Sequence, residues 1–363
     1  MARALHLLPP APEFQTRRAA DQLRGAVSDL VKIDLHPMPR PHWTRVVRTA
    51  LALRGKTLRA YDVVHAFDAV SLNVAAMGGA TKIIYSPSAF PTLGAVKWLR
   101  SVMGVRNVQV VCPTSTMRRA YVERGVPFER CHLIRPAVDF SKINRRRDAT
   151  LRAALGYTDT DVVLLAPGET VRNGGHLEAA WVGGVMNQLD AKFQTMIWGR
   201  GPYVAQAERF ATNVCGEGFL RNAEKRLGRR LEFEELLPAA DVVVVAPTVP
   251  VPTLPIAICM AAALPIVATV TYTVSELLED RHSALMVPAP RQRLISRRIL
   301  DLIQDTQLQW SISDVARTEA YEFFSASRFN QQWRDVYNQF VQNNTVELPD
   351  PTPGAGLRFH GRA

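Results

Sequence analysis

The chain has 363 residues, which exceeds the length of one ordinary domain and suggests two. Its 47% content of apolar residues fits a globular protein, and no apolar run reaches the roughly 20 residues that a membrane-spanning helix needs. The formal net charge of +11 calls for an anionic partner or surface. Because the charge is diffuse and no helix-turn-helix, zinc-finger or ribonucleoprotein pattern accompanies it, we do not expect a nucleic-acid-binding protein.

The cysteines and the amino-terminal segment bear on the cellular compartment. The cysteines are widely spaced and form no CxxC pair, so neither a disulfide framework nor a zinc site is expected. The apolar part of the amino-terminal segment is too short for a signal peptide. We therefore expect a cytoplasmic protein.

The first part of the chain alternates between short apolar segments and amphipathic ones. This alternation is typical of strands and helices in a parallel α/β sheet. The expected strands are 4–8, 31–35, 62–66, 82–85, 108–111 and 132–134. The expected helices are 16–29, 43–59, one ending near 77, 93–103, and one running from a cap at Thr114 or Ser115 to Arg124.

The expected helix 43–59 combines an apolar stripe with many basic residues. Trp43, Val46, Val47, Ala50 and Leu51 recur at helical spacing. A basic amphipathic helix with an aromatic residue can lie on an anionic membrane surface. It can equally pack on the core with a solvated basic face, which we prefer, and peripheral contact with the inner face of a membrane stays open. The basic residues are Arg45, Arg48, Arg54, Lys56 and Arg59.

The same alternation restarts after a polar and charged segment, which indicates two domains. We expect a first domain at 1–145, a linker at 146–160 with a short helix at 149–155, and a second domain at 161–310. Residues 311–342 are expected to be helical with a break near Ser325, and 343–363 to be disordered. Further expected strands are 162–166, 193–198, 242–245, 264–268 and 284–287, and further expected helices are 176–189, one after 202, 233–239, 256–263, 276–279 and 291–305.

One loop of the second domain falls where open α/β sheets bind ligands. The β-branched run Val242–Val245 predicts a strand buried on both faces. A proline-rich loop, residues 247–255, follows it and leads into a helix of small residues. Because ligands bind at the carboxyl ends of such strands, we expect this loop to belong to a small-molecule site.

Several segments, in this order, resemble glycosyltransferases of the GT-B fold, close to family 4. In the first half they are DVVHAFDAVSLNVAA (62–76) and VVCPTSTMRRAYVERGVPFERCHLIRPAVDF (110–140), of which the second is the most specific match. In the second half they are LLAPGETVRNGGHLEAA (164–180), MIWGRGP (196–202), LLPAADVVVVAP (236–247) and MAAALPIVATVTYTVSELLEDRHSALMVP (260–288). FFSASRFNQQWRDVYNQF (323–340) resembles the carboxyl-terminal helices that cross back to the first domain.

The resemblance implies two Rossmann-like doubly wound domains that face a cleft. It implies a nucleotide-sugar donor in the second domain, a glycan or glycolipid acceptor in the first, and transfer with retention. No metal or other cofactor is expected. The donor-binding candidates are Gly168, Arg172, Arg200, Thr248, Thr273, Val274 and Glu276. The acceptor-side candidates are His65, Asp68 and Ser88, although His65 is more commonly a structural histidine at a strand end.

The chain departs from the family pattern at the expected catalytic positions. The two glutamates of the family fall at Pro250 and Ile258, whose side chains accept no hydrogen bond. Ser88 stands where the family has a histidine of the first domain, and Tyr272 and Thr273 stand where it has two glycines. The catalytic residues are therefore unknown from the sequence.

The expected diphosphate position departs as well. The Arg/Lys pair of the family falls at Glu169 and at Asn173 or Gly174. A carboxylate about 4 Å from a phosphate charge costs on the order of 4 kcal/mol at an intermediate dielectric. Two hypotheses follow. The chain is a glycosyltransferase in which Arg172 or Arg200 compensates, or it is an inactive GT-B protein that serves as a binding or scaffold partner.

Overall fold

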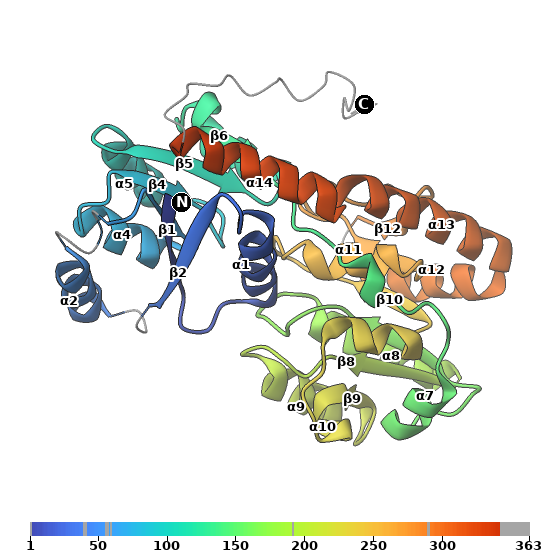
Figure 1. The fold of residues 1–363 in the computed structure, drawn as a ribbon. Coiled ribbons are helices and arrows are strands. Elements are labelled where there is room, and N and C mark those ends of the chain that lie inside the picture. Colours follow the sequence, from blue (N-terminus) through green and yellow to red (C-terminus); the bar gives the residue numbers. More distant parts are fainter. Residues whose placement is uncertain are drawn as a thin grey trace.

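The computed structural model describes residues 2–38, 42–54, 58, 60–190, 192–288 and 291–341. They form two six-stranded sheets, each flanked by helices (Figure 1). All strand pairs within both sheets are parallel. The predicted fold class, α/β with two doubly wound parallel sheets, is confirmed.

The first sheet has the strand order β2-β1-β3-β4-β5-β6. The chain reverses direction across the sheet between β1 and β3, which opens a crevice at the carboxyl ends of these neighbouring strands. The strands are β1 (Ala2–Leu8), β2 (Val31–Pro37), β3 (Val63–Ala66), β4 (Lys82–Tyr85), β5 (Asn107–Cys112) and β6 (Cys131–Leu133). The helices are α1 (Phe14–Ala26), α2 (Trp43–Leu53), α4 (Ala69–Met77), α5 (Leu93–Met103) and α6 (Ser115–Glu123), with 3-10 turns η1 (Phe128–Arg130) and η2 (Phe140–Lys142).

The second sheet has the order β12-β11-β10-β7-β8-β9, with its reversal between β7 and β10. The strands are β7 (Val162–Ala166), β8 (Phe193–Ile197), β9 (Leu220–Asn222), β10 (Val242–Val245), β11 (Ile266–Thr269) and β12 (Leu285–Val287). The helices are α7 (Ala149–Leu155), α8 (His176–Leu189), α9 (Val204–Cys215), α10 (Ala223–Leu227), α11 (Leu254–Ala261), α12 (Gln292–Gln304) and α13 (Thr306–Phe323), with the 3-10 helix η3 (Phe233–Ala239). All four residues of β10 are buried, as predicted for a β-branched strand covered by helices on both faces.

The last described helix, α14 (Ala326–Val341), returns to the first sheet (Figure 1). Its residues Trp333, Tyr337 and Phe340 share a core with Leu23 of α1 and Ala4 of β1. The expected crossover is therefore confirmed, and α14 packs on the first domain by burying large aromatic side chains.

The short helix α7, expected in the linker, is anchored to the second sheet. The Arg152 side chain is fully buried and donates to the carbonyls of Ala239, at 2.7 Å, and Asp161, at 2.6 Å. It also pairs with Asp241 at 3.0 Å. A buried guanidinium with this many acceptors holds α7 in a defined position.

Two differences from the expected elements are local. The expected helix 276–279 is wrong, since residues 272–277 form turns, and α2 ends at Leu53 instead of extending to 59. The expected disordered tail 343–363 lies outside the described residues, as do Lys56 and Arg59. Within the described ranges, every helix is too short or too polar to cross a membrane.

Candidate functional site

A cleft of about 410 Å³ lies between the two domains, at the carboxyl ends of both sheets. The loops after β1, β4, β5, β7 and β10 line it, together with α14, so both crevices open into one space. Its walls are mostly apolar. They include the aromatic residues Phe14, Phe67, Phe90, Phe329 and Trp333.

The proline-rich loop after β10 lines the cleft, as expected from the sequence. Pro250 lies in the wall of the cleft, whereas Ile258 is buried inside α11 and only 1% exposed. Thr273 also lines the cleft, but its hydroxyl oxygen accepts a hydrogen bond from the amide of Val251 at 3.2 Å. The two positions expected for carboxylates therefore offer no acceptor side chain to a ligand.

The loop after β7 brings one cation and one carboxylate to the cleft. Gly168 has φ of +82°, and a Cβ there would lie 2.9 Å from Cγ of Pro255, so the turn requires glycine. Glu169 lines the cleft and accepts a hydrogen bond from the amide of Phe14 at 3.1 Å. Arg172 lines the cleft too, and its exposed side chain makes no hydrogen bond or ion pair within the described part of the chain.

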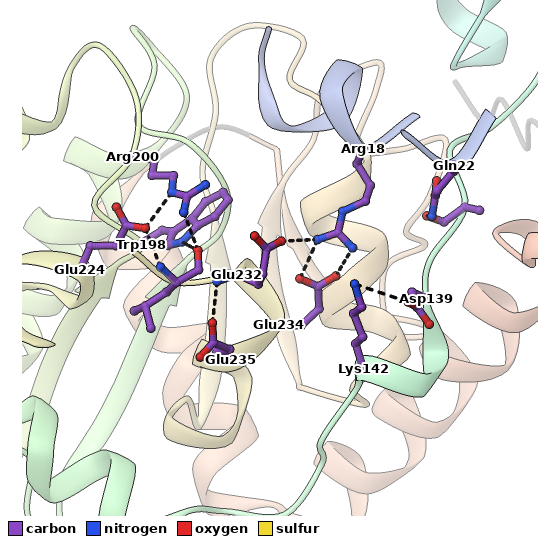
Figure 2. A network of polar contacts seen from close by, with 12 residues as sticks. Arg18, Gln22, Asp139, Lys142, Trp198, Arg200, Glu224, Glu232, Glu234 and Glu235 are labelled. Carbon is purple, nitrogen blue, oxygen red and sulfur yellow. Dashed lines mark hydrogen bonds and ion pairs between the residues drawn. The ribbon is translucent and has the colours of Figure 1, made fainter. Parts of the chain in front are cut away.

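Arg200, another donor-binding candidate, does not line the cleft. Its Nε pairs with the carboxylate of Glu224 at 2.7 Å, and its Nη2 donates to the carbonyl of Leu231 at 2.8 Å. Its guanidinium also stacks 4.5 Å from the centre of the Trp198 ring (Figure 2). Because these contacts engage one face and two nitrogens of the group, Arg200 stabilises the second domain.

Two further donor-side candidates also lie apart from the cleft wall. Val274 is fully buried in the core of the second domain. Thr248 is exposed, and its amide donates to the carbonyl of Asn173 at 3.1 Å. Neither residue belongs to the cleft lining within the described ranges.

Glu276 connects the two domains. Its carboxylate accepts hydrogen bonds from the amides of Ser115, at 2.6 Å, and Thr116, at 3.0 Å, which are the first residues of α6. It also pairs with Arg135 at 3.2 Å, and its own side chain is only 5% exposed. A carboxylate at a helix amino terminus is favourable for both its hydrogen bonds and the helix dipole. Burial lowers the pKa of Arg135, and the nearby Glu276 partly offsets this.

The acceptor-side candidates are divided between the core and the cleft. His65 is fully buried, where its Nδ1 and Nε2 contact the hydroxyls of Tyr337, at 3.0 Å, and Ser86, at 2.8 Å. Burial lowers its pKa well below the ordinary value, so it is a neutral core histidine. Asp68 caps α4 by accepting from the amide of Ser71 at 2.7 Å, and among these candidates Ser88 lines the cleft.

The sequence did not reveal two polar groups of the cleft wall. The imidazole of His176 lines the cleft, and its Nδ1 is buried without a hydrogen-bond partner among the described residues. Burial lowers its pKa to about 4. The indole nitrogen of Trp333 is buried in the same wall and is likewise unpaired there. These two nitrogens are the side-chain atoms of the described cleft-lining residues that are buried without a hydrogen-bond partner.

The charge of the described cleft wall is close to balanced. Its one arginine or lysine is Arg172, and its carboxylates are Glu13 and Glu169. Partial burial, and secondarily the charge of Glu169, raises the pKa of the Glu13 carboxyl. The residue is still exposed to solvent. Such a wall does not concentrate positive charge for an anion.

Comparison of sequences supports the resemblance in the second domain. Residues 173–305 match the family described as "Glycosyl transferases group 1". No curated protein matches the sequence.

Comparison of structures covers nearly the whole chain. HepE from Anabaena in complex with UDP and glucose has a TM-score of 0.77 and 17% identity, covering 93% of this chain and 100% of that one. A glycosyltransferase from Rickettsia africae has a TM-score of 0.76 and 13% identity, covering 95% of this chain and 100% of that one. WaaG, a glycosyltransferase involved in lipopolysaccharide biosynthesis, has a TM-score of 0.69 and 14% identity, covering 92% and 99%.

This chain is thus a protein of the GT-B fold, as the resemblance predicted. Its second domain carries the group 1 glycosyltransferase match. At these identities the solved structures establish the fold, and the chemistry of the cleft has to be argued from the residues present.

Proposed function

We propose that this chain is a catalytically inactive GT-B protein that serves as a binding or scaffold partner. The observation that carries the proposal is the charge of the described cleft wall, where two carboxylates, Glu13 and Glu169, outnumber the single cation, Arg172. A departing nucleoside diphosphate develops negative charge, which an active site has to stabilise. Each carboxylate about 4 Å from a phosphate opposes this by on the order of 4 kcal/mol at an effective dielectric of about 20.

The missing acceptors support the same proposal. Retaining transfer needs polar groups that strengthen their contacts with the sugar in the transition state. Pro250 offers only apolar atoms to the cleft, and Ile258 is packed inside α11. We propose a first domain at 1–145, a linker at 146–160, a second domain at 161–310 and crossover helices at 311–342. The cleft is lined by the two domains and by α14.

Nucleotide binding tests this proposal directly. The full chain is titrated by calorimetry with UDP-glucose, GDP-mannose, ADP-glucose, UDP and GDP, and release of the sugar from each of the three sugar nucleotides is followed by NMR. We expect no heat of binding up to millimolar nucleotide and no turnover. Turnover of any of the three sugar nucleotides would overturn the proposal.

A second candidate is a family 4 type glycosyltransferase that transfers a sugar with retention to a glycan or glycolipid acceptor. It is favoured by the unpaired Arg172 side chain and the unpaired Nδ1 of His176, which could contact a phosphate and a sugar hydroxyl. This candidate needs a nucleotide sugar and, by resemblance, no metal. Submillimolar binding of UDP-glucose that Arg172→Ala abolishes and Arg200→Ala preserves would support it over the first.

We also propose a cytoplasmic location with peripheral contact at an anionic membrane face. Trp43 and Leu51 of α2 are 74% and 57% exposed, and Leu93 and Trp98 of α5 are exposed as well. The two helices flank α4 (Figure 1). Helix α4 packs against α2, and its Asn73 accepts a hydrogen bond from the indole nitrogen of Trp98 on α5. Exposed basic residues accompany them, each worth about 1 kcal/mol near an anionic surface. These are Arg45, Arg48, Lys97 and Arg100.

Co-sedimentation with phosphatidylglycerol vesicles tests the membrane proposal. We expect binding at low salt that is lost at high salt, and a roughly tenfold weaker association for Trp43→Ala. Trp310→Ala is the matched control, because Trp310 is 67% exposed on α13 in the other domain. Absence of salt-sensitive binding, or equal loss in both variants, would contradict it.

A further inference from the structure

The first turn of α1 reaches across the cleft and inserts an aromatic side chain into the other domain. Phe14 belongs to the first domain, yet it is 2% exposed within the hydrophobic core of the second. Its ring meets Trp198 edge-on, with ring centres 5.0 Å apart, and lies 6.2 Å from the ring of Phe233. Separating the domains would return this ring and its pocket to water.

The next residue caps a helix of the second domain. The side-chain oxygen of Gln15 accepts a hydrogen bond from the amide of Leu254 at 2.9 Å and one from the hydroxyl of Thr253 at 3.4 Å. Leu254 is the first residue of α11, and Thr253 makes no side-chain capping bond of its own. The amide at the start of α11, which would otherwise need water or a ligand, is thus satisfied by the other domain.

Arg18, one turn further along α1, forms ion pairs across the same boundary. Its guanidinium makes two contacts with Glu234, at 2.9 and 3.1 Å, and one with Glu232 at 2.8 Å (Figure 2). The side chain of Glu234 is only 3% exposed and that of Arg18 is 12% exposed. The guanidinium also lies 5.1 Å from the centre of the Phe14 ring. Paired and buried charges of this kind are weakly screened and directional.

We propose that residues 14–18 are an intramolecular latch that holds the two domains closed over the cleft. Phe14, Gln15 and Arg18 use three different interactions, and all three end on the second domain. Release of this latch would let the two domains separate and widen the cleft. The proposed latch does not depend on catalysis in the cleft, because none of its contacts involves a nucleotide.

Amide hydrogen exchange of the full chain tests the latch. In Arg18→Ala and in Gln15→Ala we expect the amide of Leu254 to exchange at least tenfold faster than in the parent protein. Arg17→Ala is the matched control, since Arg17 neighbours Arg18 on α1 and its side chain makes no contact of this kind within the described residues. It should leave the exchange rate unchanged.

A second variant distinguishes opening of the domains from loss of folding. Arg18→Ala leaves the carboxylate of Glu234 buried without its partner, so the double variant Arg18→Met with Glu234→Gln removes the charges together. We expect it to keep the parent circular dichroism spectrum, while small-angle scattering reports a larger radius of gyration. An unchanged radius in the folded double variant, together with an unchanged Leu254 exchange rate in Gln15→Ala, would overturn the latch. Neither measurement uses a nucleotide, so a failure here is separate from a failure of the proposed function.

Discussion

Removing the carboxylate of Glu276 should destabilise the protein strongly, although this residue was expected to hold a ligand. Glu276→Ala leaves the amides of Ser115 and Thr116 without their acceptor and removes the ion-pair partner of Arg135. A hydrogen bond to a charged group contributes about 1.5–3 kcal/mol, and breaking one partner of a buried pair costs about 3–5 kcal/mol. These contributions overlap, so we expect a loss of about 3 kcal/mol in the free energy of unfolding.

Urea denaturation of the full chain measures this loss, with tryptophan fluorescence and circular dichroism as parallel signals. Glu279→Gln is the matched control, because Glu279 lies in the same segment and is exposed. It should change the free energy of unfolding by less than about 0.5 kcal/mol. A loss below about 1 kcal/mol in Glu276→Ala would refute the reasoning. It would mean that the carboxylate is free to serve a ligand.

Three further predictions concern the interior of the domains. Burial lowers the pKa of His6 from 6.5 to about 3, so the unfolded chain binds protons that the folded chain does not as the pH falls below 6.5. Stability should therefore fall towards acid by up to about 1.4 kcal/mol per pH unit for this group, and urea midpoints of His6→Gln should show a shallower fall. Gly175→Ala should cost at least about 2 kcal/mol by thermal denaturation, because its φ is +95° and a Cβ would lie 2.5 Å from backbone, whereas Gly216→Ala, with open space around it, should cost about 1 kcal/mol. Arg152→Met should lower the free energy of unfolding by about 3–5 kcal/mol, because it removes the buried partner of Asp241. Arg147→Met removes a half-exposed partner of the same carboxylate and should lower it by less than about 1 kcal/mol. Equal effects within either pair, or parallel pH slopes, would contradict these expectations.

The sequence alone determined most of the scaffold. The strand Val242–Val245 and the helices 149–155 and 176–189 lie where the pattern predicts them. These elements are set by local features of the sequence, namely β-branched runs and the helical spacing of apolar residues. The same local motifs, in their order, also identified the GT-B fold.

The sequence also revealed what the cleft lacks. Pro250 and Glu169 stand in the cleft wall, as expected for residues at the carboxyl ends of parallel strands. Their side-chain chemistry can be read without coordinates, because an apolar or acidic side chain has the same bonding capacity wherever the fold places it.

Only the tertiary structure decided which side chains are available to a ligand. Arg200 is paired with Glu224, Glu276 caps a helix of the other domain, and Gln15 accepts from the amide of Leu254, which lies 239 residues away in sequence. Each of these polar groups had several possible partners in the sequence. The choice depends on how the two sheets face one another, since a buried polar group pairs with whatever the packed domains bring within hydrogen-bond distance.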